Sequence, residues 1–135
     1  MSIQANKDLV RSHLDLSWNK REIEALDEVW APEAVLHLPG GQDLRGSGVI
    51  KQYLKSAVGA YIDRNLVIDD IVGEGDTVAT RWTFRGVQVG ETLGVPPSNQ
   101  QTTITGMDFY RVSDGKIVEE WFHTNLPARQ SGAVK

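Results

Sequence analysis

The sequence predicts an α+β protein in which N-terminal helices close the concave side of a curved antiparallel sheet, so that the sheet forms a cone. Two observations support this fold class. The first half of the chain shows apolar spacing of the helical kind, and the second half reads as strands separated by turn residues. Helices that precede a run of strands are typical of α+β domains. A curved sheet covered in this way encloses space, which indicates a pocket for a small molecule.

The first half is expected to contain helices and one short strand. Leu9, Val10 and Leu14 follow the helical period, as expected for an amphipathic first helix. Pro32 is expected to end the second helix, and Ser47 is expected to cap the third. The predicted elements are helices over residues 6–18, 21–30 and 47–61, and a strand over residues 34–38.

The second half is expected to supply the rest of the sheet. Gly75 and the pair Asp114-Gly115 mark tight turns between alternating segments. The predicted strands are residues 66–72, 77–89, 102–112 and 116–124. The loop over residues 90–101 is long for a hairpin, so it is interpreted either as a lid over the pocket or as a plain surface connection.

Length and composition narrow the class of protein. The 135 residues predict one domain, residues 1–135, with a loose tail from about residue 127. A net charge of -4 without a basic run argues against nucleic acid as a partner. No apolar run approaches the roughly 20 residues of a membrane span, and the N-terminus lacks the apolar core of a signal peptide. We therefore expect a cytoplasmic protein with no membrane partner.

Three runs in the second half carry a family resemblance. G-V-P-P-S, T-G-M-D-F-Y-R-V and D-G-K-I-V-E-E-W resemble the SnoaL-like polyketide cyclases of the nuclear transport factor-like superfamily, to which ketosteroid isomerase also belongs. The resemblance implies a cystatin-like, ketosteroid isomerase-like α+β barrel. It also implies a homodimer with one pocket per subunit, which carries out acid–base chemistry with neither a metal nor an organic cofactor.

The resemblance also identifies positions where this chain departs from its relatives. The position of the catalytic aspartate of the cyclases falls on Phe122, and the position of the isomerase general base falls on Leu38. A pocket position that is histidine in the cyclases and aspartic acid in the isomerases falls on Asp108. The usual chemistry of either group therefore lacks one of its residues here.

Strand alternation selects the candidate catalytic residues. Successive side chains of a strand point to opposite faces, which places Asp108 and Glu120 on the pocket side unless a bulge turns Glu120 to solvent. An apolar surround would raise the pKa of both carboxyls, so that they could act as acid and base. His37 alternates away from the pocket, but a bulge beside Pro39 would reverse it, and it is kept as a candidate base.

The remaining expectations concern the pocket wall and the opposite face. The expected wall consists of Trp18, Leu36, Leu38, Tyr61, Trp82, Phe84, Tyr110 and Phe122. The opposite face of the sheet, with aromatic residues such as Phe109 and Trp121, is the expected dimer surface. His13 is expected on a charged part of its helix, and no histidine has metal-ligand spacing, so no metal site is predicted.

Two functions fit these observations. The first is an enzyme, of the isomerase, cyclase, dehydratase or hydrolase type, that acts on a cyclic or carbonyl-bearing apolar compound through Asp108 and Glu120 or His37. The second is a non-catalytic binding protein that keeps the pocket and has lost the chemistry. Phe122 and Leu38 favour the second function, and Asp108 favours the first.

Overall fold

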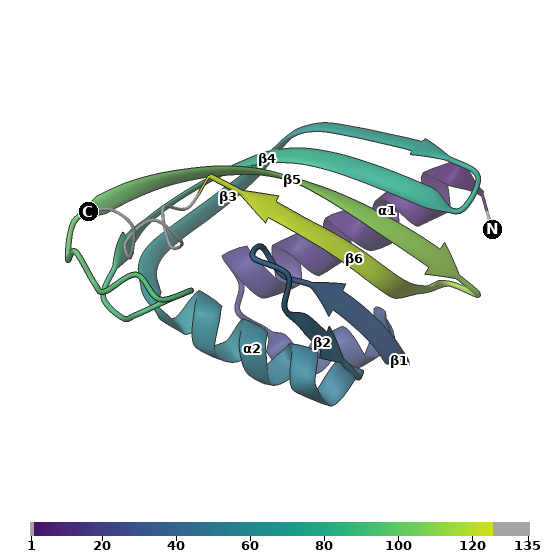
Figure 1. Ribbon diagram of the computed structural model, residues 1–135. Coiled ribbons are helices and arrows are strands. Elements are labelled where there is room, and N and C mark those ends of the chain that lie inside the picture. The colour runs from purple at the N-terminus through teal and green to yellow at the C-terminus, as the bar shows by residue number, and fades with distance from the viewer. Residues whose placement is uncertain (1, 126–135) are drawn as a thin grey trace.

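The computed structural model describes residues 2–125 and has a six-stranded curved sheet with its helices on the concave side (Figure 1). The helical elements are α1 (Ile3–Leu14), the π-helix η1 (Asp15–Asn19), the 3-10 helix η2 (Ile23–Glu28) and α2 (Ser47–Gly59). The strands are β1 (Trp30–His37), β2 (Asp43–Arg45), β3 (Tyr61–Glu74), β4 (Thr77–Gln88), β5 (Gln101–Ser113) and β6 (Lys116–Thr124). The expected α+β fold class is confirmed. The predicted loose tail lies outside the described residues.

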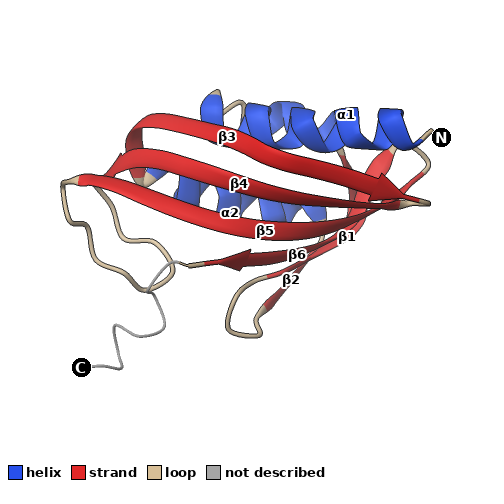
Figure 2. Cartoon of the chain, turned by 90° about the horizontal axis from the view of Figure 1, so that it is seen from above, coloured by secondary structure: helices blue, strands red, loops and turns tan. Residues whose placement is uncertain are grey.

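The sheet is open and has the strand order β2-β1-β6-β5-β4-β3. Neighbouring strands are antiparallel, except that β1 runs parallel to β6. Helix α1 packs along β3, and α2 packs against β1 (Figure 2). The helices therefore cover one face of the sheet and leave the other face of β4 and β5 uncovered.

The main error in the predicted elements concerns residues 21–30. The 3-10 helix there ends at Glu28, and Trp30 begins β1. Pro32 lies inside that strand, where the pairing of β1 with β6 is irregular between Trp30 and Val35. Proline has no backbone N–H to donate to the ladder, and such irregular positions are where a strand tolerates it.

Smaller differences occur around α2. The three-residue strand β2 was not predicted; it pairs with the end of β1 through a hairpin closed by Leu38 N–H donating to the Gln42 carbonyl at 2.8 Å. The residue before α2 is Gly46, which has a φ of 95°, so Ser47 is the first residue of the helix and not its cap. Strand β3 starts at Tyr61, directly after α2.

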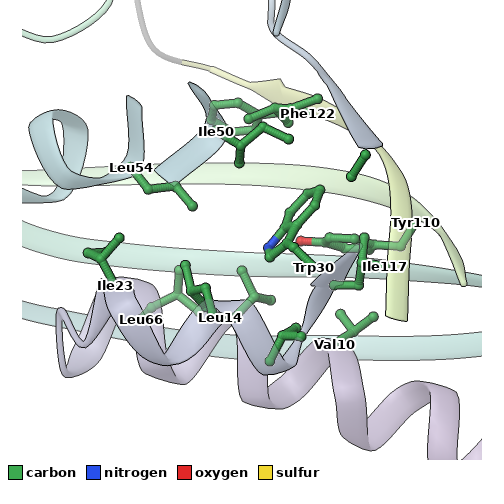
Figure 3. Packing of buried hydrophobic residues seen from close by; sticks show 14 of the residues in the cluster. Val10, Leu14, Ile23, Trp30, Ile50, Leu54, Leu66, Tyr110, Ile117 and Phe122 are labelled. Carbon is green, nitrogen blue, oxygen red and sulfur yellow. The ribbon is translucent and has the colours of Figure 1, made fainter. Parts of the chain in front are cut away.

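The core lies between the helices and the concave face of the sheet. Val10 and Leu14 of α1 belong to this core together with Trp30 and Ile117, and Ile50 of α2 lies near Phe122 (Figure 3). Burial of each such side chain contributes roughly 1.5–3 kcal/mol to folding. The packing of two helices onto one face of the sheet fixes which side chains of β4, β5 and β6 are removed from water.

The uncovered face carries large apolar side chains. Met107 and Phe109 of β5 are 62% and 54% exposed, and Val72 of β3 is also exposed. These residues lie on the face that the sequence assigns to a dimer interface. A homodimer stays a prediction, which a sedimentation measurement at micromolar concentration would test.

Candidate functional site

Two carboxyl groups lie next to each other on the concave face of the sheet. Asp108 of β5 and Glu120 of β6 are each 5% exposed. In the ladder between these strands Glu120 pairs with Tyr110, and Asp108 pairs with Phe122. The strands do contain an irregularity, but it falls between Arg111 and Val112, nearer the turn. Glu120 therefore keeps its inward position.

Hydrogen bonds join the two carboxyls to each other and to the sheet. The Trp82 indole donates to Asp108 Oδ1 at 3.2 Å, and the Tyr110 hydroxyl donates to Asp108 Oδ2 at 3.0 Å. Glu120 is hydrogen-bonded to both Asp108 and Tyr110. Every polar partner of Asp108 therefore comes from an inward position of β4, β5 or β6.

Burial decides the ionisation of this pair. It raises the pKa of Asp108 well above its ordinary value, and the neighbouring Glu120 carboxylate raises it further. The pKa of Glu120 is also raised by burial, while its hydrogen bonds to Asp108 and Tyr110 lower it. Burial likewise raises the pKa of the Tyr110 phenol well above its ordinary value. Two carboxyls in this position titrate as a coupled pair.

His13 completes the cluster, contrary to the expectation that it lies on a charged surface. Its side chain is 2% exposed, and its Nε2 lies 3.6 Å from Glu120 Oε1. The Trp30 indole donates to His13 Nδ1 at 3.2 Å. Since an indole can only donate, Nδ1 is the acceptor and Nε2 carries the proton that faces Glu120. Burial lowers the pKa of His13 to about 4, against an opposing effect of Asp108, so the ring is neutral at pH 7.

The sequence contains a pattern that predicts the burial of His13. Val10, His13, Leu14 and Ser17 recur at positions i, i+3, i+4 and i+7, which is the spacing of a single buried stripe on a helix. The Ser17 hydroxyl is also buried and donates to the His13 carbonyl at 2.7 Å. The position of His13 in this stripe, and not the charge of its neighbours, determines its environment.

Two small cavities adjoin the cluster, each with about 20 Å³ of open space. Asp108, Glu120 and His13 line the second cavity, whereas the first has an aromatic wall with Tyr61 and Phe84. The two cavities share the side chains of Trp18, Tyr53, Leu66, Trp82 and Phe122. A space of this size holds about one water molecule. A larger ligand therefore requires the shared side chains to move.

The expected wall residues are distributed unevenly over these cavities. Tyr61 and Phe84 line the first cavity and Leu36 lines the second, while Trp18, Trp82 and Phe122 line both. Leu38 is buried in the core but lines neither cavity, and Tyr110 reaches the site through its bond to Asp108.

The loop between β4 and β5 contributes to the wall of the first cavity through Thr92 and Leu93. The Gln88 side-chain amide holds this loop by donating to the carbonyls of Gly90 and Val95, each at 3.0 Å. The loop is thus more than a surface connection, because it covers one side of the cavity.

The structure does not bring His37 to the carboxyl pair. Its Nδ1 lies 2.7 Å from Asp43 Oδ1, its Nε2 lies 2.6 Å from Glu119 Oε2, and its ring stacks on Trp121. The irregularity in β1 falls before Val35, so alternation persists through His37 and turns it to the outer face. The structure therefore places His37 on the outer face, apart from Asp108 and Glu120.

We expect His37 to make the protein more stable at acidic than at alkaline pH. Its hydrogen bond to Glu119 raises its pKa, with a smaller contribution from Asp43. The stabilisation is complete below the pKa of the unfolded state, about 6.5, and is lost as the pH rises through the folded-state pKa. His37→Gln should remove this part of the pH dependence in denaturation curves. The exposed His123→Gln is the control, and an unchanged pH slope in His37→Gln would contradict the expectation.

The described part of the chain shows neither a metal-binding group nor a membrane-spanning helix. Residues 2–125 contain no group of three or more histidine, cysteine, aspartate or glutamate side chains arranged to hold a metal ion. None of the helices in the same range has the length and apolar character of a membrane span.

Comparisons with known proteins identify the family. The family model described as SnoaL-like polyketide cyclase matches residues 8–129, so the chain belongs to this family. A search of curated proteins finds no match.

Solved structures agree with this assignment. IdmH from Streptomyces antibioticus, described as a candidate polyketide cyclase, is 32% identical with a TM-score of 0.76, and the match covers 95% of this chain and 99% of IdmH. A candidate SnoaL-like polyketide cyclase from Jannaschia sp. CCS1 is 22% identical with a TM-score of 0.86, over 100% of this chain and 97% of its own. A protein of the nuclear transport factor-like group from Burkholderia pseudomallei is 16% identical with a TM-score of 0.77, over 97% of each chain. The last two show the shared fold.

Proposed function

We propose that this protein is an enzyme that carries out acid–base chemistry on a cyclic, carbonyl-bearing apolar compound, with Asp108 and Glu120 as the reacting groups. The observation that carries the proposal is the buried carboxyl pair, whose two members are hydrogen-bonded to each other and border a cavity walled by aromatic side chains. A carboxyl group kept neutral by an apolar site can donate a hydrogen bond to a substrate carbonyl.

The pair can supply both halves of a proton transfer. The protonated carboxyl donates its proton to the carbonyl oxygen, and the ionised partner accepts a proton from the adjacent carbon, which produces an enol without net transfer to water. Burial raises the pKa of both carboxyls, which favours the protonated form of each. The His13 Nε2–H faces Glu120 Oε1 at 3.6 Å, so a neutral ring lies beside this carboxyl.

The alternative, a binding protein without chemistry, is favoured by Phe122. This ring is paired with Asp108 in the sheet, and it occupies the position that the family resemblance assigns to a catalytic aspartate. It lines both cavities and makes the space beside the carboxyl pair more apolar. A binder would retain affinity for apolar ketones and show no proton exchange.

The proposal is tested by following exchange of the acidic C–H protons of 2-tetralone, a bicyclic ketone, in deuterated buffer by NMR. We expect exchange faster than in buffer alone, and a loss of about 100-fold or more in Asp108→Asn and in Glu120→Gln. Asp114→Asn, at an exposed turn, is the matched control and should exchange like the wild type. Binding without accelerated exchange would support the binder, and absence of both would refute the proposal.

A further inference from the structure

The hydroxyl of Tyr61 is a buried polar group that lacks a protein partner. The Tyr61 side chain belongs to a residue only 2% exposed, and its hydroxyl oxygen forms no hydrogen bond within the structure. A buried hydroxyl that is left unpaired costs roughly 1–3 kcal/mol, so native proteins rarely retain one without a reason. Tyr61 also lines the first cavity, so the unpaired group belongs to a residue in the wall of a space that a ligand can enter once the shared side chains move.

The ring that carries this hydroxyl is held in a fixed position. It packs edge-on against Phe84, with 5.0 Å between ring centroids. The Tyr61 backbone carbonyl accepts a hydrogen bond from Arg64 Nη1 at 2.9 Å, and the residue is paired with Gln88 in the sheet. Burial raises the pKa of the phenol to about 12, so it remains a protonated donor at neutral pH. The donor is therefore preorganised.

The carboxyl pair and Tyr61 lie in different but adjoining cavities. Asp108 and Glu120 line the second cavity and are absent from the wall of the first, whereas the reverse holds for Tyr61. Four aromatic side chains line both spaces: Trp18, Tyr53, Trp82 and Phe122. If the shared side chains move apart, the cavities become one space, with the carboxyl pair in one part of its wall, Tyr61 in another, and the mostly apolar shared side chains and the Tyr53 phenol between them.

We propose that Tyr61 is a second anchoring residue for the ligand, and that the ligand is a flat apolar compound with an oxygen acceptor at each end. One oxygen contacts Asp108 and Glu120, and the opposite oxygen accepts a hydrogen bond from the Tyr61 hydroxyl. This inference rests on the proposed function, because it requires a ligand beside the carboxyl pair. It adds a specificity-determining residue and narrows the ligand class to compounds with oxygens on opposite sides of a ring system.

Two probes that differ by one oxygen test this assignment. 2-Tetralone carries a single carbonyl, and 6-hydroxy-2-tetralone adds a hydroxyl at the opposite end of the same ring system. Binding of each probe is measured by calorimetry to the wild type and to Tyr61→Phe. We expect Tyr61→Phe to weaken binding of 6-hydroxy-2-tetralone by about five- to tenfold, the value of one hydrogen bond. Binding of 2-tetralone should change by less than about twofold.

Two further variants separate binding from stability. Tyr61→Phe should leave the midpoint of thermal unfolding unchanged or raise it, because it removes an unpaired hydroxyl. Thr80→Val removes another buried and unpaired hydroxyl that lines neither cavity; because Thr80 pairs with Asp108 in the ladder, any change in binding should be the same for both probes, unlike that of Tyr61→Phe. Tyr110→Phe, which removes the hydrogen bond to Asp108, should instead lower the midpoint.

The outcomes are distinguishable. Equal affinity of wild type and Tyr61→Phe for 6-hydroxy-2-tetralone, or equal losses for both probes, would overturn the role of Tyr61 and leave the proposed function intact. If neither probe binds to the wild type, the proposed function fails, and the assignment of Tyr61 fails with it.

Discussion

Replacing Asp108 with asparagine is expected to flatten the dependence of the free energy of unfolding on pH. Burial and the neighbouring Glu120 raise the pKa of Asp108, so the folded protein retains a proton that the unfolded chain releases. The stability contributed by this proton is present below the unfolded pKa of about 3.9 and is lost as the pH rises through the folded pKa. Between the unfolded and the folded pKa, each pH unit lowers the free energy of unfolding by about 1.4 kcal/mol per proton. The asparagine side chain would keep the shape and hydrogen-bonding capacity of the site without this ionisation.

The measurement is chemical denaturation across pH 4 to 8 for wild type, Asp108→Asn and Asp114→Asn. The control removes an exposed carboxyl from a turn, where it should leave the slope of the wild type unchanged. Asp108→Asn should match the wild type at the acidic end and exceed its stability toward neutral pH. If the wild type gains stability with rising pH over this range and Asp108→Asn removes the gain, then Asp108 is ionised in the folded protein and the buried-acid mechanism is wrong.

Replacing Gly106 with alanine is expected to be among the most destabilising single changes in the sheet. A Cβ built at Gly106 would lie 2.2 Å from Cζ2 of Trp82 and 2.6 Å from the backbone oxygen of His123. The backbone cannot yield without a large cost in free energy, so the indole would have to leave, and its hydrogen bond to Asp108 would break. We expect a loss of about 3 kcal/mol in the free energy of unfolding, at the upper end for overpacking.

Gly48→Ala in α2 is the matched control, because a Cβ at Gly48 has no atom within 4 Å. It should cause no loss of stability, since alanine is a better helix former than glycine. Denaturation curves measure the stability of both variants, and the fluorescence of the protein reports a displacement of the Trp82 indole. Comparable stability of Gly106→Ala and Gly48→Ala would contradict the expectation that the Trp82 indole is packed against Gly106.

The sheet part of the site was predictable because a strand places its side chains by a strict two-residue period. That period alone places Asp108, Tyr110 and Phe122 on the inner face and His37 on the outer face, as in the structure. A bulge next to Glu120 would have turned its side chain outward, but the irregularity lies closer to the turn. The local sequence does not predict where such an irregularity falls. Alternation therefore predicted the direction of these side chains, but not their partners.

The helical part was not predictable in the same way. The environment of His13 depends on Trp30, which the sequence places in a helix and the structure places in β1. The parallel pairing of β1 with β6 brings Trp30 beside Ile117, and no nearby residue indicates it. Contacts between segments far apart in the chain determine the polarity and protonation of the histidine, and these contacts exist only in the tertiary structure.

The parallel pairing of β1 with β6 has a consequence for how the protein is made. It joins the segment around His37 to the segment around Trp121, so most of the chain must be synthesised before the ladder can close. Closing so large a loop carries an entropic cost that local helices and hairpins do not incur. A nascent chain that ends before Lys116 has Asp108 but neither Glu120 nor Phe122. The acid pair is therefore assembled late, and only a chain that reaches its last strand acquires a site in which chemistry can take place.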